Sequence, residues 1–354
     1  MKKEEILETK ESENPRFSIV IPTYNVAKQV GTSIESVMRQ TFQNFELLIV
    51  DDCSTDNTWE VLNKYAAKSE GKIKLARNEK NSGPSIARNV ALAQAKGEYI
   101  VYLDGDDTLY DRKTLEKVNN TIGDDNPDII YFGVQYVGGS NKAYIPNAQN
   151  STREARIVCD MHFPVASKVW RREFLEKNDI SFIGGMYYED MVYSIKGAIL
   201  AEKLSYGEYP IYIYYRNREG SIMSTPNMAR CKDMYKMLYY LMDLYEKTPQ
   251  HLKPYLMSFI KNETLSVPMR LDAILKSFED NTMAPVVPKR NYVFTEAEPS
   301  VINGTVPVDG QPKLIPLVGG QEESNIEINV ESPIAVAAEN IEKDKGMPNI
   351  KFNN

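Results

Sequence analysis

The sequence Tyr-Leu-Asp-Gly-Asp-Asp at residues 102–107 follows the apolar run Glu-Tyr-Ile-Val at 98–101, which is typical of a buried β-strand. Three carboxylates, Asp104, Asp106 and Asp107, lie within four residues and repel one another. A divalent cation would balance this repulsion, because carboxylate oxygens suit Mg²⁺ or Mn²⁺ and these ions commonly bridge to substrate phosphates. Gly105 would let a ligand approach the backbone closely. The alternative is a polar turn, with Asp107 capping the next helix.

Composition limits the classes of protein that the chain can belong to. Its 354 residues are 42% hydrophobic, which is enough for a sizeable core and for two or three domains. The net charge of -7 argues against a dedicated nucleic-acid binder. Residues 291–354 hold ten Asp or Glu and four Lys or Arg, so most of the negative charge lies there.

Cysteine, histidine and apolar runs exclude several kinds of site. Three widely spaced cysteines, with no CxxC pair, fit a reducing compartment. Two histidines argue against a serine–histidine triad and against a multi-histidine metal site. Residues 1–16 are charged and lack the apolar centre of a signal peptide, and no apolar run is long enough for a transmembrane helix.

Apolar runs alternate with amphipathic segments in the first part of the chain. Strands are predicted at 17–21, 45–50, 72–76 and 98–101, and helices at 31–40, around 57–65 and at 84–95. This alternation predicts a mostly parallel sheet with right-handed crossovers. Ligands bind beyond the carboxyl ends of such strands, so Tyr24, Asp52 and Asp104 are expected to converge on one edge.

The later part of the chain has a different pattern. A strand is predicted at 128–134, a loop at 138–152, a helix opening at Glu189 and Asp190, and strands within 203–215. Two apolar helices follow at 228–247 and 252–278. They are expected to form a small helical region, an oligomer contact or a membrane-surface patch. The segment 281–354 reads as a low-order acidic tail.

Four motifs, in this order and spacing, resemble family 2 glycosyltransferases of the GT-A fold. They are Ile-Val-Ile-Pro-Thr-Tyr-Asn at 19–25, Val-Asp-Asp-Cys-Ser-Thr-Asp at 50–56, Asn-Ser-Gly-Pro-Ser-Ile-Ala-Arg-Asn at 81–89 and Leu-Asp-Gly-Asp-Asp at 103–107. The resemblance covers residues 17–222 and implies an α/β GT-A domain, Rossmann-like and mostly parallel, flanked by helices. Residues 1–16 would then be a leader, and 223–280 a helical C-terminal region before the tail.

The resemblance also implies roles for individual residues. Asp190 matches the catalytic base of inverting members, and Asp106 matches the residue that holds Mn²⁺ or Mg²⁺. Within the nucleotide-sugar site, the Tyr24 ring would stack on the base, Asp52 would accept a hydrogen bond from it unless Asp51 does, and Asp104 would contact the ribose. The full nucleotide-sugar set is Pro22, Thr23, Tyr24, Asn25, Asp52, Gly83, Arg88, Asp104 and Gly105.

Each of these residues also has a structural interpretation. Tyr24 could be loop packing, Asp52 a turn former, Arg88 a solvated helix charge and Asp190 a helix-start charge. The residues assigned to the diphosphate or to an anionic acceptor are equally compatible with surface ion pairs. They are Glu189, Arg216, Arg218 and Ser221. Trp170 could offer a sugar-stacking face, but burial in the core is favoured.

The sequence therefore predicts an inverting, metal-dependent glycosyltransferase. The donor would be a nucleotide-sugar, with a UDP-sugar favoured, and one carboxylate would take the proton of the attacking hydroxyl. By analogy with the family, the acceptor would be a glycan or lipid-linked precursor of a bacterial surface polysaccharide. The enzyme would act in the cytoplasm, with peripheral membrane contact or homo-oligomerisation through residues 228–278.

Other functions make different demands on the sequence. A catalytically silent subunit that binds nucleotide-sugar within a glycan-assembly complex is the main alternative, although both the Asp-rich motif and Asp190 are present. A nucleotidyltransferase would need a Gly-rich phosphate loop after the first strand, where Pro-Thr-Tyr-Asn stands at 22–25. The Gln-x-x-Arg-Trp motif of processive synthases is absent, which favours the addition of one or a few sugars.

Overall fold

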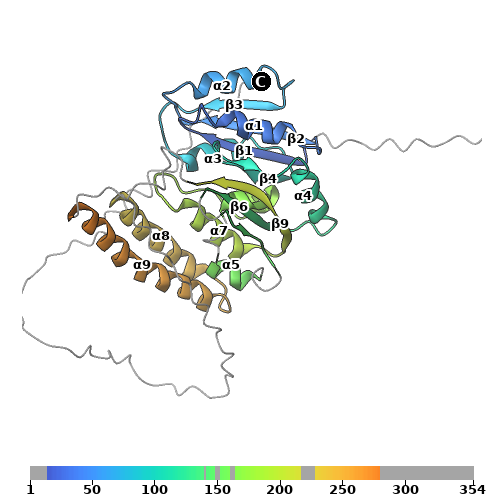
Figure 1. Cartoon of the computed structure of the whole chain (residues 1–354). Coiled ribbons are helices and arrows are strands. Elements are labelled where there is room, and N and C mark those ends of the chain that lie inside the picture. Colours follow the sequence, from blue (N-terminus) through green and yellow to red (C-terminus); the bar gives the residue numbers. More distant parts are fainter. Residues whose placement is uncertain (1–13, 139–140, 148–151, 160–163, 217–227, 280–354) are drawn as a thin grey trace, which may run out of the picture. The chain divides into compact units, whose positions relative to one another are not determined.

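The computed structural model describes residues 14–138, 141–147, 152–159, 164–216 and 228–279 (Figure 1), and the structural statements below concern these residues. All of them belong to one compact unit. Most of the predicted leader and all of the predicted acidic tail lie outside the described residues. The boundary predicted near residue 222 also falls outside them, and it stays a prediction.

A single sheet organises the described residues. Its nine strands there run in the order β3-β2-β1-β4-β8-β6-β9-β5, with β7 paired to β6. The strands are β1 (Phe17–Thr23), β2 (Phe45–Asp51), β3 (Ile73–Arg77), β4 (Tyr99–Tyr102), β5 (Thr108–Leu109), β6 (Ile129–Val137), β7 (Ala143–Tyr144), β8 (Lys168–Arg171) and β9 (Leu204–Tyr215). The predicted parallel arrangement holds for β1 to β4, and β6 also pairs parallel with β9. Because β8 runs antiparallel between β4 and β6, the whole sheet is mixed.

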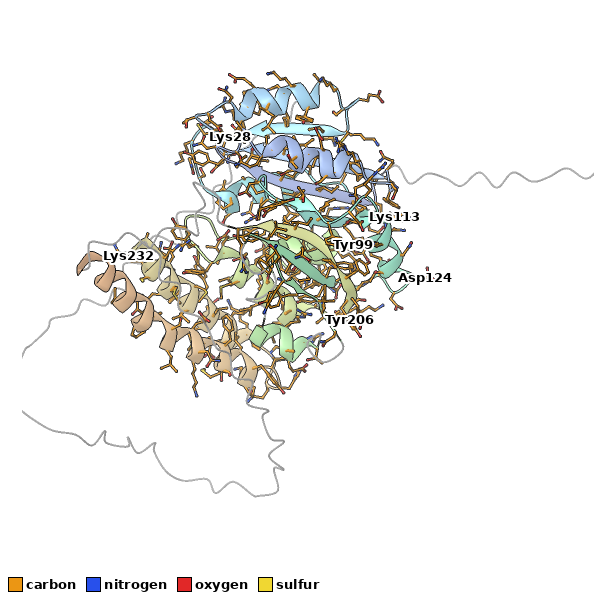
Figure 2. The ribbon with its side chains drawn as sticks, in the orientation of Figure 1. Lys28, Tyr99, Lys113, Asp124, Tyr206 and Lys232 are labelled. Carbon is orange, nitrogen blue, oxygen red and sulfur yellow. The ribbon has the colours of Figure 1, made fainter. Side chains whose placement is uncertain are left out.

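Helices cover the central strands because those strands are apolar on both faces. Every residue of β1 and of β2 is buried, as expected for strands packed between two layers. The covering elements are α1 (Val30–Met38), α2 (Thr58–Ala66), α3 (Pro84–Leu92), α4 (Thr114–Ile122), α5 (Arg153–Cys159), η2 (Val165–Ser167), α6 (Arg172–Lys177) and α7 (Glu189–Leu200). Tyr99 is fully buried in this core, whereas Lys113 and Asp124 lie at its exposed rim (Figure 2). Trp170 is also fully buried, which confirms its predicted place in the core.

Two long helices, α8 (Met228–Lys247) and α9 (Lys253–Glu279), lie side by side in the helical hairpin of Figure 1. Their buried side chains form a second hydrophobic cluster together with α7, including Ile195, Met237 and Leu256. The apolar helices predicted from the sequence therefore pack within the chain. None of the helices in the described part of the chain is long and apolar enough to cross a membrane.

Candidate active site

Parallel pairing brings three loops to one edge of the sheet. Thr23 at the end of β1 lies opposite Asp51 at the end of β2, and Val20 lies opposite Tyr102 at the end of β4. The loops that carry Tyr24, Asp52 and Asp104 therefore start at the carboxyl edge, where the alternation of strands and helices predicted them. This edge is the candidate active site.

Arg88 of α3 joins the Asp-rich loop to the start of α7. Its Nη2 lies 2.7 Å from Oδ1 of Asp104, and its Nη1 lies 3.1 Å from Oε1 of Glu189. Burial disfavours the charged guanidinium, but Asp104 and Glu189 outweigh it and raise the pKa of Arg88. With 5% of its surface exposed, Arg88 is not a solvated helix charge. Its contact with the donor stays a prediction, since the described partners are carboxylates.

Asp107 belongs to the floor of this site. Its carboxylate accepts hydrogen bonds from the Tyr212 hydroxyl and, at 3.0 Å, from the Tyr215 backbone N–H. The same Tyr212 oxygen lies 3.2 Å from Oδ2 of Asp104. Burial, reinforced by the charges of Asp104 and Asp106, raises the pKa of Asp107 to about 7. The alternative of Asp107 as a helix cap is wrong, because β5 follows it directly and α4 begins only at Thr114.

Gly105 is required by the protein's own packing. A Cβ at this position would lie 2.9 Å from Cγ2 of Thr23 and 3.1 Å from the carbonyl oxygen of Pro22. The Gly105 carbonyl also accepts a hydrogen bond from Ser33 Oγ at 2.9 Å. The Asp-rich loop therefore sits directly on the end of β1, with the half-buried Asp106 beside it.

Asp52 holds the loop that leads into α3. Only 2% exposed, it accepts hydrogen bonds from the Gly83 N–H and from Asn78 Nδ2, both at 2.6 Å, and from the Ser82 N–H at 3.0 Å. Gly83, at the helix start, has a φ of +86°, which favours glycine. Asp51 binds Arg77 instead, at 3.0 Å. Both aspartates are thus engaged within the protein, and the base contact of Asp52 stays a prediction.

The loop after β1 has one side chain suited to stacking. Pro22 and Thr23 are buried in the strand, whereas the Tyr24 ring is 43% exposed at the carboxyl edge. Asn25 adopts a φ of +51°, and its Oδ1 accepts the Thr55 N–H at 2.8 Å. Asn25 therefore ties the β1 loop to the β2 loop, and Tyr24 offers the flat face that a nucleotide base would need.

The predicted base lies at the first turn of α7. Glu189 and Asp190 open the helix, after Tyr188 with a φ of +67°. Burial and then the charge of Asp190 raise the pKa of Glu189 to about 7, although Arg88 acts in the opposite direction. The two adjacent carboxylates thus share a poorly solvated position, with Arg88 beside them.

Helix α8 fixes the loop before this turn. Oδ2 of Asp233, which is 6% exposed, accepts the Tyr187 backbone N–H at 2.9 Å, and Oδ1 of Asp233 lies 2.9 Å from Lys236 Nζ. The Arg230 guanidinium lies 5.4 Å from the centre of the Tyr187 ring. Sequence reasoning missed Asp233, because a contact with a backbone N–H 46 residues away leaves no motif.

Of the predicted anion-binding residues, Arg216 directly follows β9 and Glu189 opens α7. The Arg216 guanidinium lies 3.9 Å from the centre of the Tyr136 ring. Arg218 and Ser221 lie outside the described residues. Glu189 forms an ion pair with Arg88 and thereby helps to fix the Arg88 side chain. Its predicted contact with an acceptor stays a prediction.

A metal ion would find few protein ligands here. Among the described residues, no group of three or more His, Cys, Asp or Glu is arranged to hold one. Asp107 is hydrogen-bonded to β9, and Asp104 contacts Arg88 and Tyr212. The predicted metal residue is the half-buried Asp106 between them, and a single carboxylate together with substrate phosphates suits an ion such as Mg²⁺.

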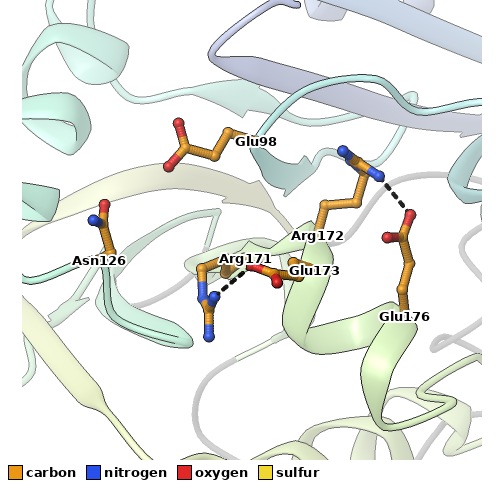
Figure 3. Close-up of a pocket in the computed structure, with 6 residues that line it drawn as sticks. All are labelled: Glu98, Asn126, Arg171, Arg172, Glu173 and Glu176. Atoms are coloured by element: carbon orange, nitrogen blue, oxygen red, sulfur yellow. Dashed lines mark hydrogen bonds and ion pairs between the residues drawn. The ribbon is translucent and has the colours of Figure 1, made fainter.

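The cavity in Figure 3 is a separate feature. It measures about 310 Å³ and lies at the amino edge of the sheet, opposite the candidate site. Its lining residues are Glu98, Asn126, Arg171, Arg172, Glu173 and Glu176. Two ion pairs lie among these residues, Arg171–Glu173 at 2.9 Å and Arg172–Glu176 at 2.6 Å (Figure 3). We interpret it as a structural ion-pair network.

Comparison with known proteins gives consistent matches. Residues 18–194 match the family model described as glycosyl transferase family 2. Poly(ribitol-phosphate) β-N-acetylglucosaminyltransferase TarS of Staphylococcus aureus is 30% identical over 63% of this chain and 39% of its own length. The corresponding enzyme TarP of the same species is 31% identical over 63% of this chain and 72% of TarP. The chain thus spans less than half the length of TarS.

Solved structures agree on the fold. The crystal structure of S. aureus TarS residues 1–349 in complex with UDP-GlcNAc has a TM-score of 0.59 and 27% identity, and covers 71% of this chain and 73% of that one. The mannosyltransferase PcManGT from Pyrobaculum calidifontis, in complex with GDP-Man and Mn²⁺, has a TM-score of 0.55 and 18% identity over 76% of each chain, a likeness of fold alone. The fold is the GT-A fold predicted from the sequence.

Proposed function

Because the chain belongs to glycosyl transferase family 2 and is a glycosyltransferase, we propose that it transfers a sugar from a UDP-sugar to a hydroxyl group with inversion. The observation that carries this proposal is the buried Arg88, which joins Asp104 of the Asp-rich loop to Glu189, the neighbour of Asp190. Donor motif and candidate base are thereby parts of one site. The acceptor we propose is a bacterial surface glycan or lipid-linked polymer, since TarS and TarP are named for poly(ribitol-phosphate).

The donor would lie along the carboxyl ends of β1, β2 and β4. The exposed ring of Tyr24 would stack on the base, and Asp104 would receive the ribose hydroxyls. Asp52 would keep the wall of the site in place by holding the Ser82–Gly83 backbone. Asp106 would hold Mn²⁺ or Mg²⁺, and the bound ion would neutralise the charge that develops on the diphosphate leaving group.

The acceptor would approach from the side of α7. Asp190 takes the proton of the acceptor hydroxyl as its oxygen bonds to the anomeric carbon, and the bond from that carbon to the diphosphate breaks on the opposite face. One base is enough for this direct displacement, in contrast to the two carboxylates of glycosidases. The hydrogen-bonded backbone of Tyr187 supports this assignment, because it anchors the loop that leads into the helix carrying Asp190.

A donor screen tests the proposal. Purified protein is incubated with UDP-, GDP-, CMP- and dTDP-sugars in Mn²⁺ or in EDTA, and release of the nucleotide is measured together with binding by calorimetry. Binding and slow, metal-dependent hydrolysis of a UDP-sugar are expected. If no nucleotide-sugar binds under either condition, the proposal fails. If one binds but is never turned over in the presence of any acceptor, the silent-subunit alternative takes its place.

Peripheral membrane contact through residues 228–278 is a separate part of the proposal. Tyr235, Tyr239 and Met242 are 60%, 40% and 42% exposed along one side of α8, and Lys232 and Lys236 are exposed nearby. Aromatic and basic side chains together suit an anionic membrane surface, and the same face would also suit a second copy of the chain. Sedimentation with anionic liposomes at low salt tests the first role, and analytical ultracentrifugation tests the second.

A further inference from the structure

The order of strands divides the candidate site into two halves. Strands β3, β2 and β1, with Tyr24 and Asp52 at their ends, lie on one side of β4 and its Asp-rich loop. Strands β8, β6 and β9 lie on the other side. Since the first half carries the motifs assigned to the nucleotide, the carboxyl ends of β6 and β9 face the half of the site that the nucleotide does not use.

Aromatic side chains line that second half. Tyr212 and Tyr214 lie two residues apart on β9, so they project from the same face of the sheet, and the Tyr212 hydroxyl already contacts Asp104. Tyr136 of β6 is the direct partner of Tyr214 in the strand register, and their ring centres lie 5.5 Å apart. Tyr144 of β7 extends the row, also 5.5 Å from the Tyr136 ring. A strip of tyrosines therefore leads away from the Asp-rich loop.

A positively charged side chain lies at the far end of this strip of tyrosines. Arg216 continues β9, its N–H donating to the Val137 carbonyl at 2.8 Å, and its exposed guanidinium covers the Tyr136 ring. In the part of the chain that the structure describes, no carboxylate forms an ion pair with Arg216. Burial raises the pKa of the Tyr136 hydroxyl, with Arg216 opposing and Asp190 adding to the shift, so both charges act at this tyrosine.

We propose that Tyr136, Tyr144, Tyr214 and Arg216, here called the acceptor strip, bind the acceptor, and that this acceptor is a sugar or polyol chain carrying phosphodiester groups. The exposed Tyr144 ring and the half-buried Tyr214 ring offer apolar surface to the C–H groups of such a chain, while the Tyr136 ring supports the Arg216 guanidinium. A guanidinium without a carboxylate partner suits a phosphate oxygen pair. The inference rests on the proposed glycosyl transfer, because it assigns the acceptor half of that site.

A variant of Arg216 can distinguish acceptor binding from binding of the donor diphosphate. A residue that binds the diphosphate contributes to donor hydrolysis by water as much as to transfer. A residue of the acceptor strip contributes to transfer alone, because water needs no aromatic platform. The two roles therefore predict different results for one variant in two reactions.

The test compares UDP-sugar hydrolysis with acceptor binding in the same protein. Arg216→Ala and Tyr144→Ala are compared with Arg39→Ala, directly after α1, and Tyr110→Ala, directly after β5. Tyr110 is a matched control, since it is 39% exposed against 42% for Tyr144. Binding of a short poly(ribitol-phosphate) and of a neutral N-acetylglucosamine oligomer is measured by calorimetry at two salt concentrations, and transfer to each is measured with the UDP-sugar that the screen selects.

The wild type is expected to bind the phosphate-bearing oligomer more tightly than the neutral one, and less tightly as salt rises. Arg216→Ala should weaken this binding roughly tenfold, the size of one charged hydrogen bond, and Tyr144→Ala several-fold, with hydrolysis unchanged. Equal loss of hydrolysis in Arg216→Ala, equal effects in the control variants, or failure of the wild type to prefer the phosphate-bearing oligomer would each overturn the proposal. Absence of UDP-sugar binding in the wild type would instead refute the proposed function.

Discussion

Two groups of charged residues lie at opposite edges of the same sheet, and their charges are balanced differently. At the amino edge, Asp128 accepts hydrogen bonds from Arg171 and from the N–H groups of Glu202 and Lys203. Burial alone would raise the pKa of Asp128, but these donors outweigh it and lower that pKa. At the carboxyl edge, burial and neighbouring carboxylates raise the pKa of Asp107 and of Glu189 to about 7.

This difference in charge balance distinguishes the structural ion-pair network at the amino edge from the candidate site at the carboxyl edge. The amino-edge cavity is lined by charges that have partners within the protein. The carboxyl edge gathers several carboxylates around the guanidinium of Arg88. Ionisable groups with shifted pKa values concentrate at functional sites, because binding and catalysis need charges that the fold itself leaves incompletely balanced. The amino-edge cavity is therefore a structural feature, and the carboxyl edge is the candidate site.

The largest effect expected at the carboxyl edge comes from Asp190→Asn. This change keeps the shape of the side chain but removes the proton acceptor, so transfer should fall on the order of 10²–10⁴-fold. Binding of the UDP-sugar, measured by calorimetry, should stay within about twofold because the nucleotide half of the site is untouched. Unchanged transfer would show that another group is the base.

Replacing Arg88 and Arg171 with methionine compares the two edges directly. Arg88→Met leaves Asp104 and Glu189 without their common partner, and loss of one member of a buried ion pair costs about 3–5 kcal/mol of unfolding free energy. Arg171→Met should cost less, about 1.5–3 kcal/mol, since its side chain is 27% exposed and Asp128 keeps two backbone donors. Urea unfolding at pH 7 measures both. Equal losses of unfolding free energy in the two variants would contradict the proposed difference between the two edges.

Asp233 tests whether α8 belongs to the catalytic scaffold. Asp233→Ala removes the acceptor of the Tyr187 N–H and should lower kcat roughly tenfold by misplacing Asp190, with little change in the KM for the UDP-sugar. Asp233→Asn keeps an oxygen in place and should restore most of the rate. Asp243→Ala, an exposed α8 residue paired with Lys247, is the matched control. A parallel fall of kcat in both alanine variants would make the effect one of helix stability.

The positions of the site loops could be predicted from the sequence, but the contacts that hold these loops in place could not. Tyr24, Asp52 and Asp104 could be placed at one edge because the alternation of strands and helices sets the direction of β1, β2 and β4. The contacts of Tyr212 with Asp107 and of Asp233 with the Tyr187 backbone could not, since they depend on the path of the chain after β4. The antiparallel insertion of β8 was hidden for the same reason. Gly105 was noticed, but its close packing against the end of β1 was not foreseen, and its contact with a ligand stays a prediction.

The smallest effects are expected in the pH dependence of the unfolding free energy. As pH rises, Asp128 at the amino edge should increase this free energy, whereas Glu189 at the carboxyl edge should decrease it. The folded-state pKa of Asp128 is depressed, so its contribution is present above the unfolded value of about 3.9 and is lost as pH falls through the folded value. The folded-state pKa of Glu189, about 7, lies above its unfolded value, so Glu189 lowers stability progressively as pH rises to 7. Asp128→Asn should therefore reduce the loss of unfolding free energy at acid pH. Glu189→Gln should reduce the loss of unfolding free energy that occurs as pH rises toward neutral.

Urea unfolding of the wild type and of both variants between pH 3 and 8 measures these slopes. Because each carboxylate titrates in its own window, the two changes should be separable: the Asp128 variant differs in slope only in acid, and the Glu189 variant only between about pH 4 and 7. Slopes of the same sign would mean that Arg88 balances Glu189 as fully as Arg171 balances Asp128. In that case the carboxyl edge would be as self-sufficient electrostatically as the amino edge, and its assignment as the active site would rest on the motifs alone.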